Sequence, residues 1–339
     1  MNKSYILDFA KKVLAIDSPS GYTKKVIEML EKEAHELGYE TFKNAKGNLH
    51  IIVEGKSNER TIGVSAHTDT LGLMVRSISS DGTLKFTTLG GPQLPTLDGE
   101  YCRIYTRNGH CYTGTILSTS PASHVYSDAD KARNCENMMI RLDEVVKSKE
   151  DVEKLGIQNG DIIAIDPKTT ITPTDFIKSR FLDDKISVAC LFGVLHHFKE
   201  NEIKPAYKTI FIISTYEEVG HGAANIPEVD ELLACDMGCI GLDLACSEYD
   251  VSICAKDSSG PYDYEMVSKL IELAKQEKCN YAVDIYPYYG SDVSAALRGG
   301  NNIRGALIGP GVHASHGMER THYQAVESAV KLMIAYLCQ

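Results

Sequence analysis

Apolar residues near the N-terminus recur every three to four positions, the spacing that places side chains on one face of a helix. Two helices are expected there, over residues 5–14 and 26–37. The runs NLHIIVEG and RTIGVSAH follow and are typical of strands. The second run is almost entirely apolar before His67, as expected for a strand buried at the centre of a sheet.

The pattern changes between residues 73 and 172. Short segments of alternating character, such as LMVRSISSDGTLKF and EYCRIYTRNGHCYTGTIL, are separated by Asp-Gly and Asn-Gly turns. These features are typical of antiparallel β structure. We therefore predict a small β-rich domain over residues 73–172, inserted into a larger domain that comprises residues 1–72 and 173–339.

Helical and strand patterns alternate again after residue 175. Examples are the helical run KISVACLFGVLHHFKEN and the strand-like runs YKTIFIIST, CIGLDLA and IRGALIG. This alternation favours an α/β fold in which helices cover both faces of a mixed sheet.

Acidic residues and histidines stand where these apolar runs end. His67, Glu217, Glu218 and Asp243 lie at or just after predicted strands, and Asp183 and Asp184 open a predicted helix. A last group, His313, His316 and His322, follows the final strand. In open α/β sheets, ligands bind outside the carboxyl ends of the strands. We expect these side chains to converge there.

Nitrogen and oxygen ligands without thiolate suit zinc, cobalt or manganese. The set is large enough for two ions that share one carboxylate. Several carboxylates in one cleft repel one another, and two dications would remove that repulsion.

Composition excludes several classes of function. The 339 residues carry a net charge of −11 without a basic cluster, which argues against nucleic acid or an anionic membrane as the partner. The N-terminus lacks the pattern of a secretory signal, and no apolar run approaches the ~18 residues that span a bilayer. A cytoplasmic protein is expected. Ten cysteines without a C-x-x-C pair are interpreted as reduced, structural thiols.

The chain resembles the tetrahedral (TET) aminopeptidases, a family of cocatalytic dinuclear-zinc metallopeptidases that includes glutamyl, leucyl and deblocking enzymes. The resemblance runs essentially end to end and is carried by SAHTDTLGLMV, SRFLDDKISVACL, STYEEVGHGAA, GLDLA and YGSDVSAAL. It implies a zinc-exopeptidase type of fold and removal of N-terminal residues from short peptides. It also implies two divalent ions per subunit, bridged by a hydroxide. Zinc is the expected metal, and cobalt and manganese are alternatives.

The resemblance also assigns roles to individual residues. His67 corresponds to a terminal metal ligand, Asp183 to the bridging carboxylate, and Glu218 and Asp243 to ligands of one ion each. His316 completes the set.

Two further assignments concern neighbours of these ligands. Glu217 corresponds to the general base, and Asp69 to the acid that orients His67, two positions away on the same face of the strand. The motif around His316 departs from the family pattern. His313 is the alternative ligand, and His316 is preferred because its distance from Pro310 is closer to the usual spacing.

The resemblance finally implies a role for the insert over residues 73–172, in dimerisation and substrate access. Members of the family assemble dimers into hollow dodecamers, so a homo-oligomer is expected. Two alternatives remain open from the sequence. One is a dinuclear-metal deacylase acting on N-acyl amino acids or small metabolites, and the other is a non-catalytic peptide-binding assembly protein.

Overall fold

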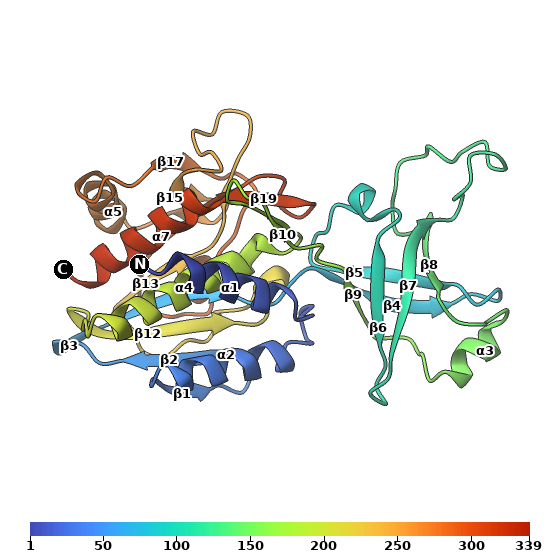
Figure 1. The fold of residues 1–339 in the computed structure, drawn as a ribbon, viewed down its shortest axis with the longest axis horizontal. Helices are drawn as coiled ribbons and strands as arrows, with labels where there is room; N and C mark the ends of the chain where they lie inside the picture. Colours follow the sequence, from blue (N-terminus) through green and yellow to red (C-terminus); the bar gives the residue numbers. More distant parts are fainter. The chain divides into compact units, whose positions relative to one another are not determined.

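The computed structural model describes residues 1–339, which form two compact units (Figure 1). The first unit comprises Met1–Asp69 and Lys168–Gln339, and the second comprises Thr70–Pro167. The domain borders predicted from the sequence lie after residues 72 and 172, three and five residues later in the chain.

The first unit is built on one large mixed sheet. Its strands run in the order β1-β2-β12-β3-β13-β18-β15-β16, with β14 paired to β18 and β17 paired to β15. The neighbours β12, β3, β13 and β18 are parallel, so their carboxyl ends meet at one edge. The strands are β1 (Glu40–Lys43), β2 (Leu49–Val53), β3 (Ser57–His67), β12 (Tyr207–Ser214), β13 (Glu231–Cys235), β14 (Gly238–Cys239), β15 (Val251–Asp257), β16 (Gly260–Pro261), β17 (Tyr281–Ile285) and β18 (Arg304–Val312).

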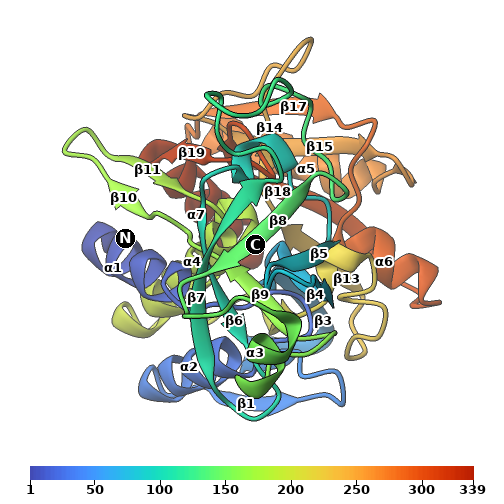
Figure 2. The same ribbon diagram turned by 90° about the vertical axis from the view of Figure 1, so that its right-hand side faces the viewer.

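Helices cover both faces of this sheet, as the sequence predicted. On one side, α4 packs between α1 and α7 and against β3, and α6 lies on the other side (Figure 2). Because neighbours surround α4, it is buried almost all round from Leu182 to Leu195, and its sequence is correspondingly apolar. The helices are α1 (Lys3–Leu14), α2 (Lys24–Glu36), α4 (Leu182–Glu200), α5 (Tyr264–Gln276), α6 (Asp292–Arg298) and α7 (Tyr323–Leu337).

A small three-stranded sheet joins two distant parts of the first unit. Its strands are β10 (Thr170–Ile171), β11 (Phe176–Ser179) and β19 (Glu319–His322), in the order β10-β11-β19. Ser179 pairs with Glu319, and this register brings the segment before α4 beside the segment before α7.

The second unit is a closed six-stranded barrel, in the order β4-β5-β8-β7-β6-β9. Alternate residues point inward, and the interior is filled by apolar side chains such as Leu73, Phe86, Ile104 and Ile140. Its elements are β4 (Gly72–Ile78), β5 (Leu84–Leu89), η1 (Leu94–Leu97), β6 (Tyr101–Tyr105), β7 (Cys111–Ser118), β8 (Met138–Leu142), α3 (Lys149–Lys154) and β9 (Ile162–Ile165).

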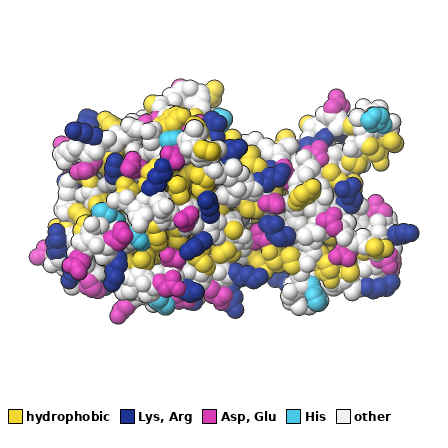
Figure 3. Space-filling view, in the orientation of Figure 1, with side chains coloured by type: hydrophobic (Ala, Val, Ile, Leu, Met, Phe, Trp, Pro, Cys, Tyr) yellow, Lys and Arg dark blue, Asp and Glu magenta, His cyan; other side chains and the backbone are white.

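Three further features bear on the sequence analysis. On the face drawn in Figure 3, acidic and basic side chains are interspersed. All ten cysteines are free thiols. None of the helices has the length and apolar character needed to cross a membrane.

Candidate metal centre

The parallel strands deliver three acidic or imidazole groups to the same edge of the sheet. β3 ends at His67, which is in register with Ser214 at the end of β12. The short helix η2 (Glu217–Val219) follows β12, and Asp236 follows β13 directly. These residues therefore meet because their strands end side by side.

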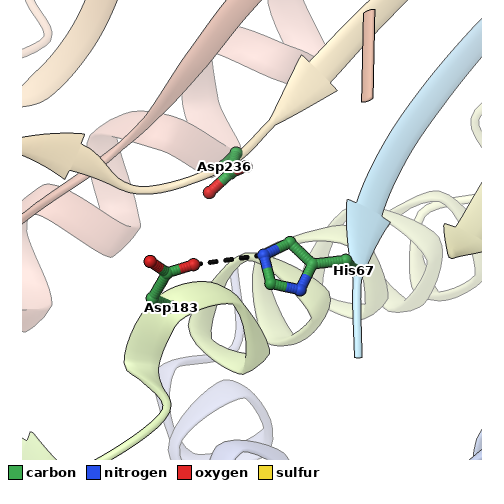
Figure 4. A group of neighbouring side chains, drawn as sticks. All are labelled: His67, Asp183 and Asp236. Carbon is green, nitrogen blue, oxygen red and sulfur yellow. Dashed lines mark hydrogen bonds and ion pairs between the residues drawn. The ribbon is translucent and has the colours of Figure 1, made fainter. Parts of the chain in front are cut away.

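His67, Asp183 and Asp236 form one group of potential metal ligands (Figure 4). Their ligand atoms all lie within 4.8 Å of one another, and all three residues are buried. The Nε2 atom of His67 lies 3.1 Å from Oδ1 of Asp183. Its Nδ1 lies 3.0 Å from the backbone carbonyl oxygen of Asp69. Because a carbonyl can only accept a hydrogen bond, Nδ1 carries the proton and donates it into this bond, and Nε2 faces the group.

Asp183, Glu218 and His316 form a second group, again with ligand atoms within 4.8 Å. His316 Nε2 lies 3.4 Å from Oδ2 of Asp183 and 3.7 Å from Oε2 of Glu218. Asp183 thus presents Oδ1 to His67 and Oδ2 to His316. A carboxylate that faces both groups has the arrangement of a bridging ligand.

A buried glutamate fixes the backbone of two members of the second group. Glu319 Oε2 accepts a hydrogen bond of 3.0 Å from the backbone N–H of Asp183, and Oε1 accepts one of 3.0 Å from that of His316. Burial and the nearby Asp183 raise the pKa of Glu319 to about 8. This residue was missed from the sequence because its position depends on the pairing of β11 with β19.

Asp69 holds the first group and the double glutamate together. Its Oδ1 accepts a 3.1 Å hydrogen bond from the backbone N–H of Glu217 and lies 3.6 Å from His67 Nδ1. Its Oδ2 accepts hydrogen bonds from the Glu218 backbone N–H and the Ser20 hydroxyl. Glu217 Oε2 lies 3.7 Å from His67 Nε2, but Glu217 belongs to neither group of ligands.

Most carboxyl groups of the centre have raised pKa values, because they are buried close to one another. Burial and neighbouring carboxylates raise the pKa of Glu217 and Glu218 well above the ordinary value, and that of Asp236 to about 7. The pKa of Asp183 is lowered instead, because hydrogen bonds from His316 and His67 outweigh its burial. Glu218 Oε1 is buried without a hydrogen-bond partner. Crowded carboxylates, two imidazoles and an unpaired oxygen suit divalent cations.

Four of the five expected ligands come together, namely His67, Asp183, Glu218 and His316. His316 rather than His313 occupies the second group; His313 is exposed and pairs through its backbone with Arg320.

Asp243 requires a correction, because it lies outside both groups. It is an exposed residue in the segment 240–245, which was expected to be a strand and instead forms turns and irregular structure. The strand that leads to the site is β13, and the acid that follows it is Asp236. The run ELLAC, apolar after Glu231, precedes Asp236 directly and was the sequence signal for this strand, but an apolar run does not show which strand it pairs with.

The sequence matches the family described as M42 glutamyl aminopeptidase over residues 47–332. The Bacillus subtilis protein YhfE is 47% identical over 334 residues, which covers 98% of this chain and 96% of YhfE. The chain belongs to the M42 glutamyl aminopeptidase family.

Solved structures related to the M42 family share the fold. The TET aminopeptidase of a Thaumarchaeota archaeon superposes with a TM-score of 0.90 at 21% identity, covering 100% of this chain and 97% of that one. The TET1 peptidase of Pyrococcus horikoshii, which can assemble into a tetrahedron or a large octahedral shell, gives 0.86 at 24% identity. It covers 98% of this chain and 99% of the other. M42 peptidases are metal-dependent aminopeptidases, and the two groups around Asp183 are the candidate metal centre of this member.

Proposed function

We propose that this M42 member removes N-terminal residues from short peptides with two divalent ions bound around Asp183. The observation that carries the proposal is the pair of ligand groups that share this carboxylate. His67 and Asp236 would complete the set for one ion, and Glu218 and His316 the set for the other. With only nitrogen and oxygen donors, the centre suits zinc, with cobalt and manganese as alternatives.

The bound ions would supply a water of lowered pKa and a Lewis acid for the peptide carbonyl group. The chain itself must then move the proton, and we assign this task to Glu217. Its carboxylate lies 3.7 Å from Nε2 of His67 without belonging to either group, and Asp69 fixes its backbone. We propose that Glu217 accepts the proton of the attacking water and passes it to the departing amine, which balances the proton transfer.

Asp69 and its backbone carbonyl orient the imidazole of His67. The carbonyl oxygen accepts a hydrogen bond from Nδ1–H, and the nearby carboxylate favours the same tautomer. Nε2 is then left unprotonated, which is the state in which imidazole binds a metal ion.

The excess of carboxylates at the centre favours an exopeptidase. A peptide with a free N-terminus carries an ammonium group, which these carboxylates attract. An internal peptide bond presents no such charge near the reacting carbonyl group. This argument supports aminopeptidase activity over cleavage within chains, and it leaves the preferred N-terminal residue open.

We further propose that the chain forms a homo-oligomer of dimers, up to a dodecamer. The fold of P. horikoshii TET1, which forms closed assemblies, supports this proposal. The barrel of Thr70–Pro167, with exposed Tyr101, Val125, Tyr126 and Val145, is the part we assign to dimerisation and substrate access. Exposed apolar side chains of this size are typical of contact surfaces.

Elemental analysis paired with a panel of substrates tests the proposed function. We expect two divalent ions per chain and release of anilide from aminoacyl-anilides, with activity lost on chelation and restored by zinc, cobalt or manganese. N-acyl amino acids should remain intact. Deacylation without anilide release would instead indicate a deacylase, and a chain that neither binds metal nor hydrolyses either substrate would indicate a binding protein.

A further inference from the structure

The loop between β17 and α6 brings a phenol to one of the candidate ligands. Tyr289 lies in this loop, three residues before Asp292, where α6 begins. Its hydroxyl donates a 3.0 Å hydrogen bond to the backbone carbonyl of Met237, the residue after Asp236. Burial raises the pKa of the Asp236 carboxyl, and the Tyr289 hydroxyl acts in the opposite direction, which places the phenol near that carboxyl. Tyr289 therefore contacts the segment that carries the ligand.

The carboxylate of Asp236 has few other groups to hold it. The backbone N–H of Met237 donates to Oδ1 at 2.7 Å. Neither His67 nor Asp183 forms a hydrogen bond with it. The carboxylate therefore depends on the position of Met237, and Tyr289 fixes that residue through its backbone carbonyl. A phenol carries a single proton, and here Tyr289 donates it to the Met237 carbonyl.

Tyr289 is itself held from outside the centre. Its backbone carbonyl accepts hydrogen bonds from the N–H of Ser258, at 3.0 Å, and from the Ser258 hydroxyl, at 2.6 Å. Its ring lies against that of Tyr286, with 5.2 Å between the ring centroids. Tyr286 is buried and its hydroxyl is hydrogen-bonded to Ser252 on β15. The phenol is therefore anchored by groups that are not candidate ligands.

The second ligand group is supported differently. Glu319 fixes the backbones of Asp183 and His316, and Asp69 fixes that of Glu218. None of these hydrogen bonds involves Tyr289. Removing the phenolic hydroxyl should therefore disturb one group of ligands and leave the other intact.

We propose that Tyr289 is a positioning residue that orients Asp236 and thereby sets the affinity of the ion held by His67, Asp183 and Asp236. The inference rests on the proposed dinuclear centre. Groups that orient a metal ligand through a hydrogen bond typically change metal affinity about 10–100-fold when they are removed. The two ions of this centre would then differ in their dependence on this loop.

Metal titration of the chelator-treated, full-length protein tests this inference. The variant is Tyr289→Phe, which keeps the ring and removes the hydroxyl. Tyr288→Phe is the matched control, because Tyr288 is the neighbouring residue of the same loop and its side chain is 98% exposed. Cobalt(II) is the probe, its binding followed by visible absorption and competition with a chelator. Asp236→Asn identifies which of the two binding steps belongs to the Asp236 group.

We expect wild type and Tyr288→Phe to bind two equivalents with the same affinities. In Tyr289→Phe, the step assigned with Asp236→Asn should weaken about tenfold or more, while the other step stays unchanged. Unchanged affinity at both steps would overturn the inference. Equal weakening of both steps, with a lower melting temperature of the metal-free variant, would overturn it in favour of a structural role. A wild-type protein that binds fewer than two ions would instead refute the proposed centre itself.

Discussion

Two adjacent glutamates of the same chemistry occupy different surroundings at this centre. The Glu218 carboxylate lies among the ligand atoms of Asp183 and His316, whereas that of Glu217 lies beside His67 and outside both groups. Sequence alone ordered the pair by resemblance, and the geometry gives a physical reason for the same order. This difference supports the proposed roles, in which Glu218 binds a cation and Glu217 transfers a proton.

Amide replacement of each glutamate separates the two roles. We expect Glu217→Gln to keep both ions and to lose about 100-fold or more in kcat, because its amide cannot accept the proton. Glu218→Gln should lose the ion of the second group. Elemental analysis and anilide kinetics on both variants check this pair. Loss of metal from Glu217→Gln would contradict the assignment of Glu217 as the base.

Asp236 takes the place of Asp243 as a candidate ligand, and substituting each of the two residues gives a second pair of variants. Asp236→Asn should reduce the metal content from two ions per chain to about one and abolish most activity, since an amide is a weak ligand for divalent cations. Asp243→Asn alters an exposed side chain and should leave both properties unchanged. Metal loss in Asp243→Asn, with normal content in Asp236→Asn, would restore the assignment made from the sequence.

His50 makes stability depend on pH. It is 1% exposed on β2, its ring stacks on Phe42, and burial lowers its pKa to about 4 from 6.5. The pKa of His50 is lower in the folded state than in the unfolded state. Its contribution to the free energy of unfolding is therefore complete above pH 6.5 and is lost as the pH falls toward 4.

Urea unfolding of wild type and His50→Leu measures this effect. Between pH 7 and pH 5 the wild type should lose about 1–2 kcal/mol more than the variant, which has no proton to bind at this position. The comparison cancels the carboxylates that titrate in both proteins. Parallel loss of stability in the two proteins would show that His50 does not contribute.

At the scale of elements, the parallel strands decide which residues meet. The sequence predicted β3, β12 and β18 and the acids around them, because each is a clear apolar run with a polar end. It did not predict that 240–245 is irregular, since an apolar run does not reveal its pairing partner. In the structure the pairing of β14 with β18 involves Gly238 and Cys239 and ends before this segment. Asp236 was missed for the same reason.

Gly309 on β18 tests the approach of this strand to the ligand segment. A Cβ atom at this position would lie 1.6 Å from the backbone oxygen of Asp236. Gly309→Ala must therefore push the Asp236 segment away, and we expect it to lower the free energy of unfolding by about 3 kcal/mol or more. It should also weaken the ion held by Asp236.

Gly241→Ala is the control for this substitution, because a Cβ atom there meets nothing within 4 Å. Denaturant unfolding and metal titration of both variants provide the measurements. Wild-type stability in Gly309→Ala would mean that β18 and the segment after β13 are further apart than the structure places them.

At the scale of the whole molecule, the chain combines the α/β unit that carries the candidate centre with a closed barrel. The β-rich character of the barrel followed from its alternating segments and Gly turns. Its closure did not, because closing requires the pairing of β4 with β9, strands that lie far apart in the sequence. Oligomeric assembly likewise could not be predicted from residue patterns, since it depends on the surfaces through which subunits contact one another and not on the periodicity of apolar residues.

Light scattering after size exclusion measures the assembly. We expect a mass that is an even multiple of the 37.3 kDa chain, reaching twelve copies in the complete assembly. Substituting aspartate for Val125 and Tyr126, both exposed on the barrel unit, should reduce that mass without changing metal content. A monomer mass for the wild type at micromolar concentration would refute the proposed oligomer.

Anomalous diffraction from crystals grown with zinc tests the central claim most directly. Data collected on either side of the zinc absorption edge should give two peaks in each chain, both within bonding distance of Asp183. One peak should be shared with His67 and Asp236, and the other with Glu218 and His316. A single peak, or peaks bound by other residues such as Asp243 or His313, would contradict the account of two ions bridged by Asp183.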